Sequence, residues 1–460
     1  MAQAAVAPSL SMPPGPKGAF LLGSAHELMR DWPGFSARCA RDYGDVVLYR
    51  FLHVPMCQVT HPDLIEQVLV RQASNFHKSK DYAALKFIMG NGLLTAEGPA
   101  WQAQRQLMQP AFRHESISAY AEIMSSSAES FLSRWKDGEI RDIHEDMAEL
   151  TLDVVARSLF GSKISHDARS VGSDVGAVMA RFFQQAALSF ILPDGTPLPK
   201  GPRLLRSKRR LDAKIYAIIH ERRSSPAPGN DLLQILLDAQ DEAGSRMTDE
   251  QLRDEIMTLF LAGHETTANA LTWTWFLLSQ NPHVERALSA ELDSVLAGAP
   301  PSLRDLPRLP YTEMVVKESM RLYPPAWGIG RRAIHDFELN GFRIPAGTNV
   351  FILQWLVHRD PRFFPDPLKF DPERWRDDPI RRGRLPRFAY FPFGGGPRVC
   401  IGAGFAMMEA TLLLATLAQR FRLELPPNTR VTPHFSITLR PKHGLKMRLH
   451  RRVRSDQTQN

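Results

Sequence analysis

A ten-residue segment, Phe-Gly-Gly-Gly-Pro-Arg-Val-Cys-Ile-Gly at residues 393–402, constrains the fold more than any other part of the chain. Its three consecutive glycines let the backbone turn tightly and approach a flat ligand closely. Cys400 comes just before an apolar helix that we expect to begin near Gly402, and the N–H groups at a helix start favour a thiolate over a thiol. A lone inert cysteine would not require the fixed register of Phe393 and Arg398 around it. The segment therefore predicts a metal-ligating sulfur at the start of a buried helix.

A second segment, Ala-Gly-His-Glu-Thr-Thr at residues 262–267, lies in the middle of a predicted helix over residues 249–278. Glycine inside a helix costs roughly 1 kcal/mol relative to alanine, which suggests a specific role for it. The alanine–glycine pair lets the helix bulge or kink and leaves room for a small ligand. The Thr266 hydroxyl can bond the carbonyl of Ala262 and help to hold such a distortion. Glu265 and Thr266 then place an acid and a hydroxyl side by side for proton transfer.

Apolar residues recur at three- and four-residue spacing over most of the chain, which is typical of helices. Short stretches of alternating apolar residues predict minor β-sheets. The predicted helices cover residues 63–71, 116–135, 203–223, 249–278, 282–297, 311–322 and 402–420, and the predicted strands lie near residues 46–54, 58–60, 337–345 and 348–353. The predicted fold class is therefore mostly α with minor β-sheets. The long irregular stretch over residues 360–399 is of the kind that usually carries function.

The 460-residue chain contains no Gly/Ser linker, low-complexity tract or internal repeat, which favours one large domain. We expect a Pro-rich N-terminal segment at residues 1–18, a single domain at residues 19–452 and a polar tail at residues 453–460. The apolar stretches are far shorter than the roughly 20 residues that span a bilayer, and the N-terminus lacks the features of a signal peptide. Because only three cysteines occur, a reducing cytoplasm is the expected location.

The chain is basic, with 57 Lys+Arg against 49 Asp+Glu and a formal net charge of +8. Basic clusters at residues 208–210 and 381–384 fit an acidic protein partner, an anionic membrane or nucleic acid, and equally a merely solvated surface. No zinc-finger spacing or aromatic RNA-binding signature accompanies the charge, so nucleic acid is the weakest of these interpretations.

The cysteine segment resembles the cysteine loop of the cytochrome P-450 family, Phe-Gly-x-Gly-x-Arg-x-Cys-x-Gly, with every specified position matched. The segment at residues 262–267 is similar to the family's Ala/Gly-Gly-x-Asp/Glu-Thr-Thr pattern. The resemblance covers nearly the whole chain and implies a triangular helical domain with a small N-terminal β-rich region. It implies that Cys400 is the axial thiolate ligand of a haem b iron, where its electron push favours O–O cleavage. It also implies that Arg398 contacts a haem propionate, that Phe393 packs near the sulfur and that Ala262 lies against the haem.

Glu318 and Arg321 lie one turn apart on a predicted helix. This spacing alone is weak, because it recurs at Glu27/Arg30, Glu250/Arg253 and Glu373/Arg376. The position of Glu318 before Pro324-Pro325 and upstream of residues 370–375 singles it out. By resemblance, Glu318, Arg321 and Arg374 form a buried charge network on the cysteine-loop side of the haem. Buried charges are tolerable only when each is paired, so the loss of any one should be severe.

Trp101 and Arg105 are similar to the family's Trp-x-x-x-Arg helix, whose two side chains contact a haem propionate. The same spacing recurs at Trp327/Arg331 and Trp355/Arg359. The pair is therefore chosen by its position along the chain relative to the other motifs, and not by the spacing. Arg331 lies five residues before Asp336, as the family's other propionate arginine does, and Arg332 is the alternative.

The resemblance implies a haem-thiolate monooxygenase that uses dioxygen to oxygenate a lipophilic small molecule such as a terpenoid, fatty acid, steroid or polyketide. The sequence leaves no room for a flavin domain and has no cysteines for an iron–sulfur centre, so electrons should come from a separate ferredoxin or flavodoxin with its reductase. Arg381, Arg382 and Arg384 are candidate docking residues. We expect no nucleic acid partner, no membrane anchor and a monomer. The expected substrate-pocket segments are residues 81–94, 182–197, 257–262, 326–329 and 436–437.

Two other functions stay open at this point. One is a haem-thiolate isomerase or dehydratase that acts without dioxygen, although such enzymes tend to lack the Glu265-Thr266 pair. The other is a non-enzymatic haem sensor, which an assay for an oxygenated product would exclude. A zinc protease is a third reading of His264-Glu265, but it fails because Ala268 stands where the second histidine is required.

Overall fold

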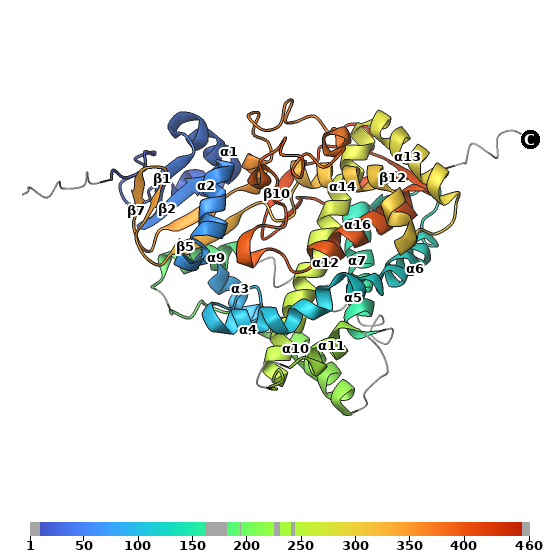
Figure 1. Ribbon diagram of the computed structural model, residues 1–460, viewed down its shortest axis with the longest axis horizontal. Helices are drawn as coiled ribbons and strands as arrows, with labels where there is room; N and C mark the ends of the chain where they lie inside the picture. Colours follow the sequence, from blue (N-terminus) through green and yellow to red (C-terminus); the bar gives the residue numbers. More distant parts are fainter. Residues whose placement is uncertain (1–9, 162–181, 194, 225–230, 241–243, 453–460) are drawn as a thin grey trace, which may run out of the picture.

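Figure 1 shows a large group of helices around the long helix α12, with a β-rich region on one side of the molecule. The computed structural model describes residues 10–161, 182–193, 195–224, 231–240 and 244–452. The α-helices of these residues are α1 (Ala25–Tyr43), α2 (Pro62–Glu66), α3 (Tyr82–Met89), α4 (Gly98–Met108), α5 (His114–Ser118), α6 (Ala121–Leu132), α7 (Ile143–Phe160), α9 (Phe182–Ile191), α10 (Pro202–Ser224), α11 (Leu232–Asp238), α12 (Asp249–Gln280), α13 (Pro282–Leu296), α14 (Pro310–Leu322), α15 (Gln354–Val357) and α16 (Ala403–Ala418). The strands are β1 (Val46–Phe51), β2 (Val54–Val59), β3 (Phe76–Lys78), β4 (Ile140–Asp142), β5 (Ile329–Ala333), β6 (Phe337–Leu339), β7 (Phe342–Ile344), β8 (Asn349–Ile352), β9 (Phe421–Glu424), β10 (Pro433–Phe435), β11 (Leu439–Pro441) and β12 (Lys446–Arg451).

Helix α12 organises the helical part. Its start is fixed by a capping box, in which the Thr248 hydroxyl accepts from the Gln251 N–H at 3.2 Å and Gln251 Oε1 accepts from the Thr248 N–H at 2.8 Å. Helix α7 packs along it, and α14 and α16 contact it as well. Apolar side chains such as Leu271 and Trp275 of α12 and Leu412 of α16 are buried in the shared core. The middle of α12 is therefore held by neighbours on several sides.

The largest sheet has five strands in the order β1-β2-β8-β5-β3. Strands β2 and β8 are parallel, and the other pairs are antiparallel. The register places Lys78 of β3 opposite Arg331 of β5. Successive side chains of a strand point to opposite faces, so Arg331 and Arg332 diverge, and Arg331 is the buried one of the two. The sheet thus brings Lys78 and Arg331 together from distant parts of the sequence.

The predicted fold class is confirmed, and α10, α13, α14 and α16 lie close to their predicted bounds. The predicted helix at residues 116–135 is wrong in one respect. It is divided between α5 and α6 by a turn, in which the Tyr120 N–H donates to the Ile117 carbonyl three residues back at 3.0 Å, rather than four residues back as in an α-helix. The predicted strand at residues 337–345 is a hairpin of β6 and β7, because Asn340 and Gly341, with φ of 52° and 76°, form the turn.

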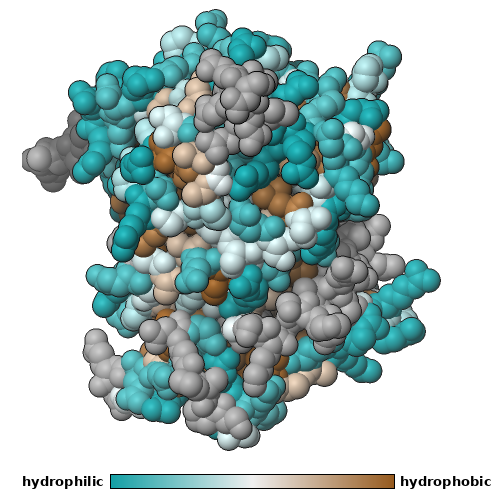
Figure 2. Space-filling view, turned by 90° about the vertical axis from the view of Figure 1, so that its right-hand side faces the viewer, coloured by the Kyte–Doolittle hydropathy of each residue, from teal (hydrophilic) through white to brown (hydrophobic). Residues whose placement is uncertain are grey.

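The proposed domain boundaries stay a prediction, since residues 1–9 and 453–460 lie outside the described part. The end of the Pro-rich segment packs against the sheet region, where Leu48 N–H donates to Pro14 O at 2.9 Å. Among the residues that the structure describes, no helix is long and apolar enough to cross a membrane. Figure 2 shows that the face on the right of Figure 1 is mostly hydrophilic, with small hydrophobic areas between the polar side chains.

Candidate active site

The cysteine segment is a tight loop that leads into α16. Gly394 and Gly396 have φ of 73° and 67°, a conformation that side chains rarely adopt. A Cβ on Gly396 would also collide with the Leu69 carbonyl, so the backbone approach there requires glycine. The Cys400 N–H donates to Phe393 O at 2.9 Å and closes the loop. The predicted geometry, a cysteine presented by a glycine turn just before a helix, is confirmed.

Cys400 is an exposed residue, whereas Cys39 and Cys57 are buried. Burial raises the pKa of each of the other two thiols to about 12, so neither provides a thiolate at neutral pH. The protein around Cys400 also removes water and raises its pKa, but a hydrogen bond from the Gly402 N–H and the positive charge of Arg105 act in the opposite direction. Cys400 is therefore the thiol of this chain that is best placed to ligate a metal.

Three basic side chains, Lys78, Arg331 and Arg398, lie close enough together for their charges to interact. Arg398 lies over the Trp101 ring at 4.0 Å, donates to Ala96 O at 2.8 Å and pairs with Glu97. Burial lowers the pKa of Lys78, and the charges of Arg331 and Arg398 lower it further. Burial likewise lowers the pKa of both arginines. Burial and mutual repulsion disfavour the charged forms of these groups, so a ligand with negative charge would stabilise them.

The geometry also separates the two candidate propionate arginines. Arg331 faces Tyr82, Asp81 and Glu97, whose charges act on it. Arg332 belongs to the opposite face of β5 and lies 3.9 Å from the Cβ position of Gly347. Arg331 alone thus shares the cluster of Lys78 and Arg398. Arg105, from the helix that carries Trp101, donates to Val399 O at 2.9 Å and so contacts the cysteine loop directly.

The middle of α12 carries small and polar side chains at Ala262, Glu265 and Thr266. Thr266 Oγ1 donates to Ala262 O at 2.6 Å, as expected from the sequence. Glu265 Oε1 accepts from Thr438 Oγ1 at 2.7 Å, and burial raises the pKa of Glu265 although this bond lowers it. Ala262 itself is exposed although it lies in the middle of α12. Small, accessible and polar groups therefore occur together on this part of the helix.

The expected bulge or kink in α12 does not occur, because the helix is α-helical without interruption from Asp249 to Gln280. Gly263 has another role. A Cβ at this position would lie 3.1 Å from Val155 Cγ2 of α7, closer than most such contacts. The glycine therefore permits the close packing of α7 against α12.

The predicted charge network is confirmed. Glu318 and Arg321 are both fully buried and form two hydrogen bonds of 2.8 Å. Arg374 approaches Glu318 at 3.3 Å. Arg321 also donates to His358 O at 2.8 Å and to Pro367 O at 2.7 Å, which ties α14 to the irregular stretch before the cysteine loop. By contrast, Glu27 pairs with Arg38, and Glu373 pairs with Arg376 on the surface.

A cavity of about 740 Å³ lies between the sheet region, α3 and α9. Four of the five expected pocket segments contribute to its wall, and residues 257–262 do not line it. The expected segment at residues 182–197 is described apart from residue 194. The residues from the four segments are Asp81, Tyr82, Leu85, Ala186, Ala187, Phe190, Trp327, Gly328, Ser436 and Ile437. Most of these side chains are apolar or aromatic, which suits a lipophilic ligand.

Comparison with known proteins decides the family. The cytochrome P-450 family model matches residues 13–447. The chain belongs to the cytochrome P-450 family. It is 40% identical to cyclooctatin synthase of Streptomyces melanosporofaciens, over 86% of this chain and 87% of that protein. It is 34% identical to pentalenene oxygenase of Streptomyces avermitilis, over 93% and 95%. The crystal structure of the cytochrome P-450DA haem domain superposes with a TM-score of 0.84 at 26% identity, covering 96% of this chain and 98% of that one.

As a cytochrome P-450, the protein is a haem-thiolate monooxygenase of the oxidoreductase class. Its residues fit the haem. Cys400 would offer the sulfur, and Arg331 and Arg398, with Lys78 beside them, would offer positive charge for the two propionates. The sequence did not reveal Lys78, Glu97 or Thr438. The sequence around each of these residues contains no recognisable motif. They are brought to the site only by the folding of the chain.

Proposed function

We propose that Cys400 ligates the iron of haem b and that the enzyme inserts one oxygen atom into a lipophilic terpenoid. The observation that carries the proposal is the position of Cys400, which a glycine loop holds just before α16, beside the Gly402 N–H and Arg105. The names of two relatives, cyclooctatin synthase and pentalenene oxygenase, support a terpenoid over a fatty acid, steroid or polyketide. The mostly apolar cavity of about 740 Å³ has a size typical of small-molecule sites.

The residues around the cysteine loop hold the cofactor in this proposal. Trp101, Arg105, Arg331 and Arg398 would bind the propionates, Phe393 would pack near the sulfur and Ala262 would lie against the haem. The haem, when bound, supplies the iron that activates dioxygen. Arg398 is already oriented by Ala96 O and Glu97, and Arg105 by Val399 O, so little side-chain freedom is lost when the propionates bind.

Thr266 and Glu265 deliver protons to dioxygen in this proposal. The Thr266 hydroxyl donates its hydrogen to Ala262 O, so its oxygen stays available to accept a hydrogen bond from a water molecule. Burial raises the pKa of Glu265, so this carboxyl keeps its proton to higher pH than an exposed one does. The Thr438 hydroxyl donates a hydrogen bond to this carboxyl and so fixes the orientation of Glu265. The pair therefore combines a water-positioning hydroxyl with a proton donor on adjacent residues.

Electrons come from a separate ferredoxin or flavodoxin in this proposal, and the protein acts as a cytoplasmic monomer. Arg381, Arg382 and Arg384 are exposed and offer positive charge to an acidic partner. Lys317 and Arg387 line a shallow hollow next to Phe393 and Gly394, which adds positive charge beside the cysteine loop. The three unpaired cysteines support a reducing location.

The test combines a spectrum and a product. Cys400→Ser should abolish the strongly red-shifted Soret band of the ferrous carbon monoxide complex, while Cys39→Ala should leave it. Persistence of the band in Cys400→Ser would refute the ligand assignment. Incubation of the wild-type protein with terpenoids, a surrogate ferredoxin system and isotopically labelled dioxygen should give a labelled product. A rearranged product without label would instead indicate an isomerase, and the absence of any product across the terpenoids would contradict the substrate class.

A further inference from the structure

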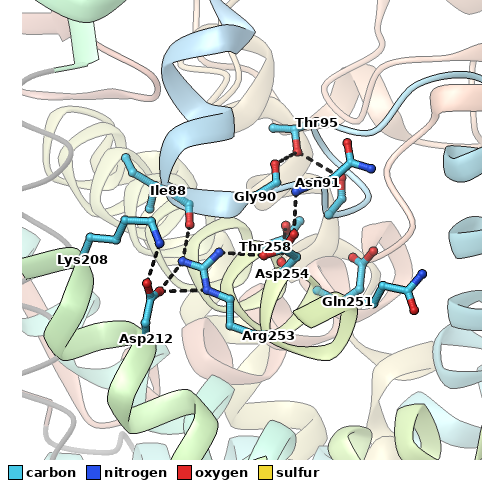
Figure 3. A network of polar contacts seen from close by, with 12 residues as sticks. Ile88, Gly90, Asn91, Thr95, Lys208, Asp212, Gln251, Arg253, Asp254 and Thr258 are labelled. Carbon is cyan, nitrogen blue, oxygen red and sulfur yellow. Dashed lines mark hydrogen bonds and ion pairs between the residues drawn. The ribbon is translucent and has the colours of Figure 1, made fainter. Parts of the chain in front are cut away.

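The segment between α3 and α4 lies directly on the first turns of α12 (Figure 3). Gly90 has φ of 60°, and a Cβ there would collide with the Asp254 carboxylate. A Cβ on Gly92 would collide with the Thr258 hydroxyl. Two glycines therefore allow the backbone of this segment to touch the helix, where other residues would hold it away.

Three consecutive side chains of α12 bind the backbone of residues 88–93. Arg253 Nη2 donates to Ile88 O at 2.8 Å. Asp254 Oδ2 accepts from the Asn91 N–H at 2.6 Å, and Glu255 Oε2 accepts from the Leu93 N–H at 2.9 Å. We call these three side chains the α12 clamp. Because these three contacts with the segment are made to main-chain groups, they fix its path whatever side chains the segment carries.

Charge pairing makes the clamp rigid. Arg253 is almost fully buried and donates to Asp254 Oδ1 at 2.7 Å and to Asp212 Oδ1 at 2.8 Å. Asp212 belongs to α10 and also pairs with Lys208. Figure 3 shows Arg253 between the two carboxylates, with the segment above it. Buried charges that are mutually paired in this way resist displacement, because moving one of them leaves the others without a partner.

The clamped segment connects the wall of the 740 Å³ cavity to the helix that carries Trp101 and Arg105. Upstream, α3 places Tyr82 and Leu85 in the wall of the 740 Å³ cavity. Downstream, Gln104 of α4 donates to Asn91 O at 2.7 Å. Gln104 lies on the helix that carries Trp101 and Arg105. Movement of the segment would therefore shift the cavity wall at its upstream end. Its downstream end is anchored to α4, the helix proposed to bind the propionates.

We infer that Asp254 and Glu255 are positioning residues for substrate binding, which hold α3 as a fixed wall of the cavity through the N–H groups of Asn91 and Leu93. This inference rests on the proposed function. Neither carboxylate lines the cavity, so both act through the segment that they bind. Their removal should widen the range of positions that Tyr82 and Leu85 adopt, and the affinity for a ligand that fills the cavity should fall.

Two azoles of different size test the inference in the haem-loaded protein. Glu255→Ala leaves the Leu93 N–H without an acceptor, and the binding of a bulky azole such as clotrimazole should weaken by at least about fivefold. Imidazole itself, which needs only the iron, should bind as in the wild type. Glu255→Gln keeps an acceptor for Leu93 and should restore clotrimazole affinity. Glu250→Ala, an exposed acid one turn earlier on α12, is the matched control and should change neither affinity.

The outcomes separate the inference from the proposed function. A wild-type protein that takes up no haem and gives no azole spectrum would defeat the proposed function itself. Unchanged clotrimazole affinity in Glu255→Ala, with normal haem content, would overturn only the positioning role. If Glu255→Ala loses haem, Asp254→Ala is the second variant, since it frees the Asn91 N–H while Arg253 keeps Asp212. Loss of haem in both variants would make the clamp merely structural and overturn the inference.

Discussion

Replacement of Glu318 by alanine should be among the most damaging single changes in this protein. The carboxylate is fully buried and accepts from Arg321 in two bonds of 2.8 Å. It also lies 3.3 Å from Arg374 and accepts from the Asp371 N–H and Trp375 Nε1, both at 3.0 Å. Breaking a buried ion pair costs about 3–5 kcal/mol, and each stranded N–H adds about 1–3 kcal/mol. The total is comparable to the about 5–15 kcal/mol that stabilises a whole domain.

Glu318→Ala should therefore yield little soluble protein with haem. The measurements are the ratio of haem to protein after purification and the urea midpoint of whatever folds. Glu373→Ala is the matched control, because Glu373 and Arg376 have the same spacing but are 49% and 64% exposed. An exposed pair contributes about 0–1 kcal/mol, so the control should keep its haem and its midpoint. If Glu318→Ala matched this control in both measurements, the reasoning from burial would be wrong.

Three further predictions follow from the site and its surroundings. Thr266→Ala should keep the haem spectrum, while the amount of product per NADPH consumed falls and the amount of hydrogen peroxide rises. The Thr267 side chain is buried, so Thr267→Ala should have a smaller effect on both amounts. The reverse pattern would show that the proton-delivery role was assigned one residue too early on α12. Reduction by an acidic ferredoxin should slow as salt rises, because charges screen over roughly 8 Å at physiological ionic strength, and a rate indifferent to salt would remove electrostatic docking. Burial raises the pKa of Glu409 from 4.5 to about 8, so the folded state holds its proton and stability falls as pH rises from 4.5 to 8. Glu409→Gln should remove this loss, a gain of up to about 3 kcal/mol at pH 7 in urea unfolding, and equal pH slopes for both proteins would contradict it.

The parts of the site that are contiguous in the sequence could be predicted well. The bond from Thr266 to Ala262 follows from helix geometry alone, since a hydroxyl reaches the carbonyl four residues back. The cysteine loop was predictable because the positions of its glycines are set by the local backbone. Glu318 could be chosen among four pairs of the same spacing only from the segments that flank it.

Groups that meet through the tertiary fold could not be predicted. Lys78 and Glu97 join the arginine cluster from β3 and the start of α4, and no local pattern marks either residue. The role of Gly263 was assigned to a kink, because a glycine inside a helix looks the same in sequence whether it bends the helix or admits a neighbour. Its contact with Val155 of α7 distinguishes the two only once the helices are packed.

Helix α12 carries both the clamp and the residues that we propose for proton delivery, and eleven positions separate Glu255 from Thr266 and Asp254 from Glu265. Eleven residues complete almost a whole number of helical turns, so the members of each pair point in nearly the same direction about 16 Å apart. The helix thus sets the distance between the clamped segment and the residues that we propose for proton delivery. One inserted residue between them would rotate one pair by about 100° relative to the other. Substitutions that enlarge the cavity are better made in α3 and α9, because the length of α12 between the two pairs sets how they are aligned.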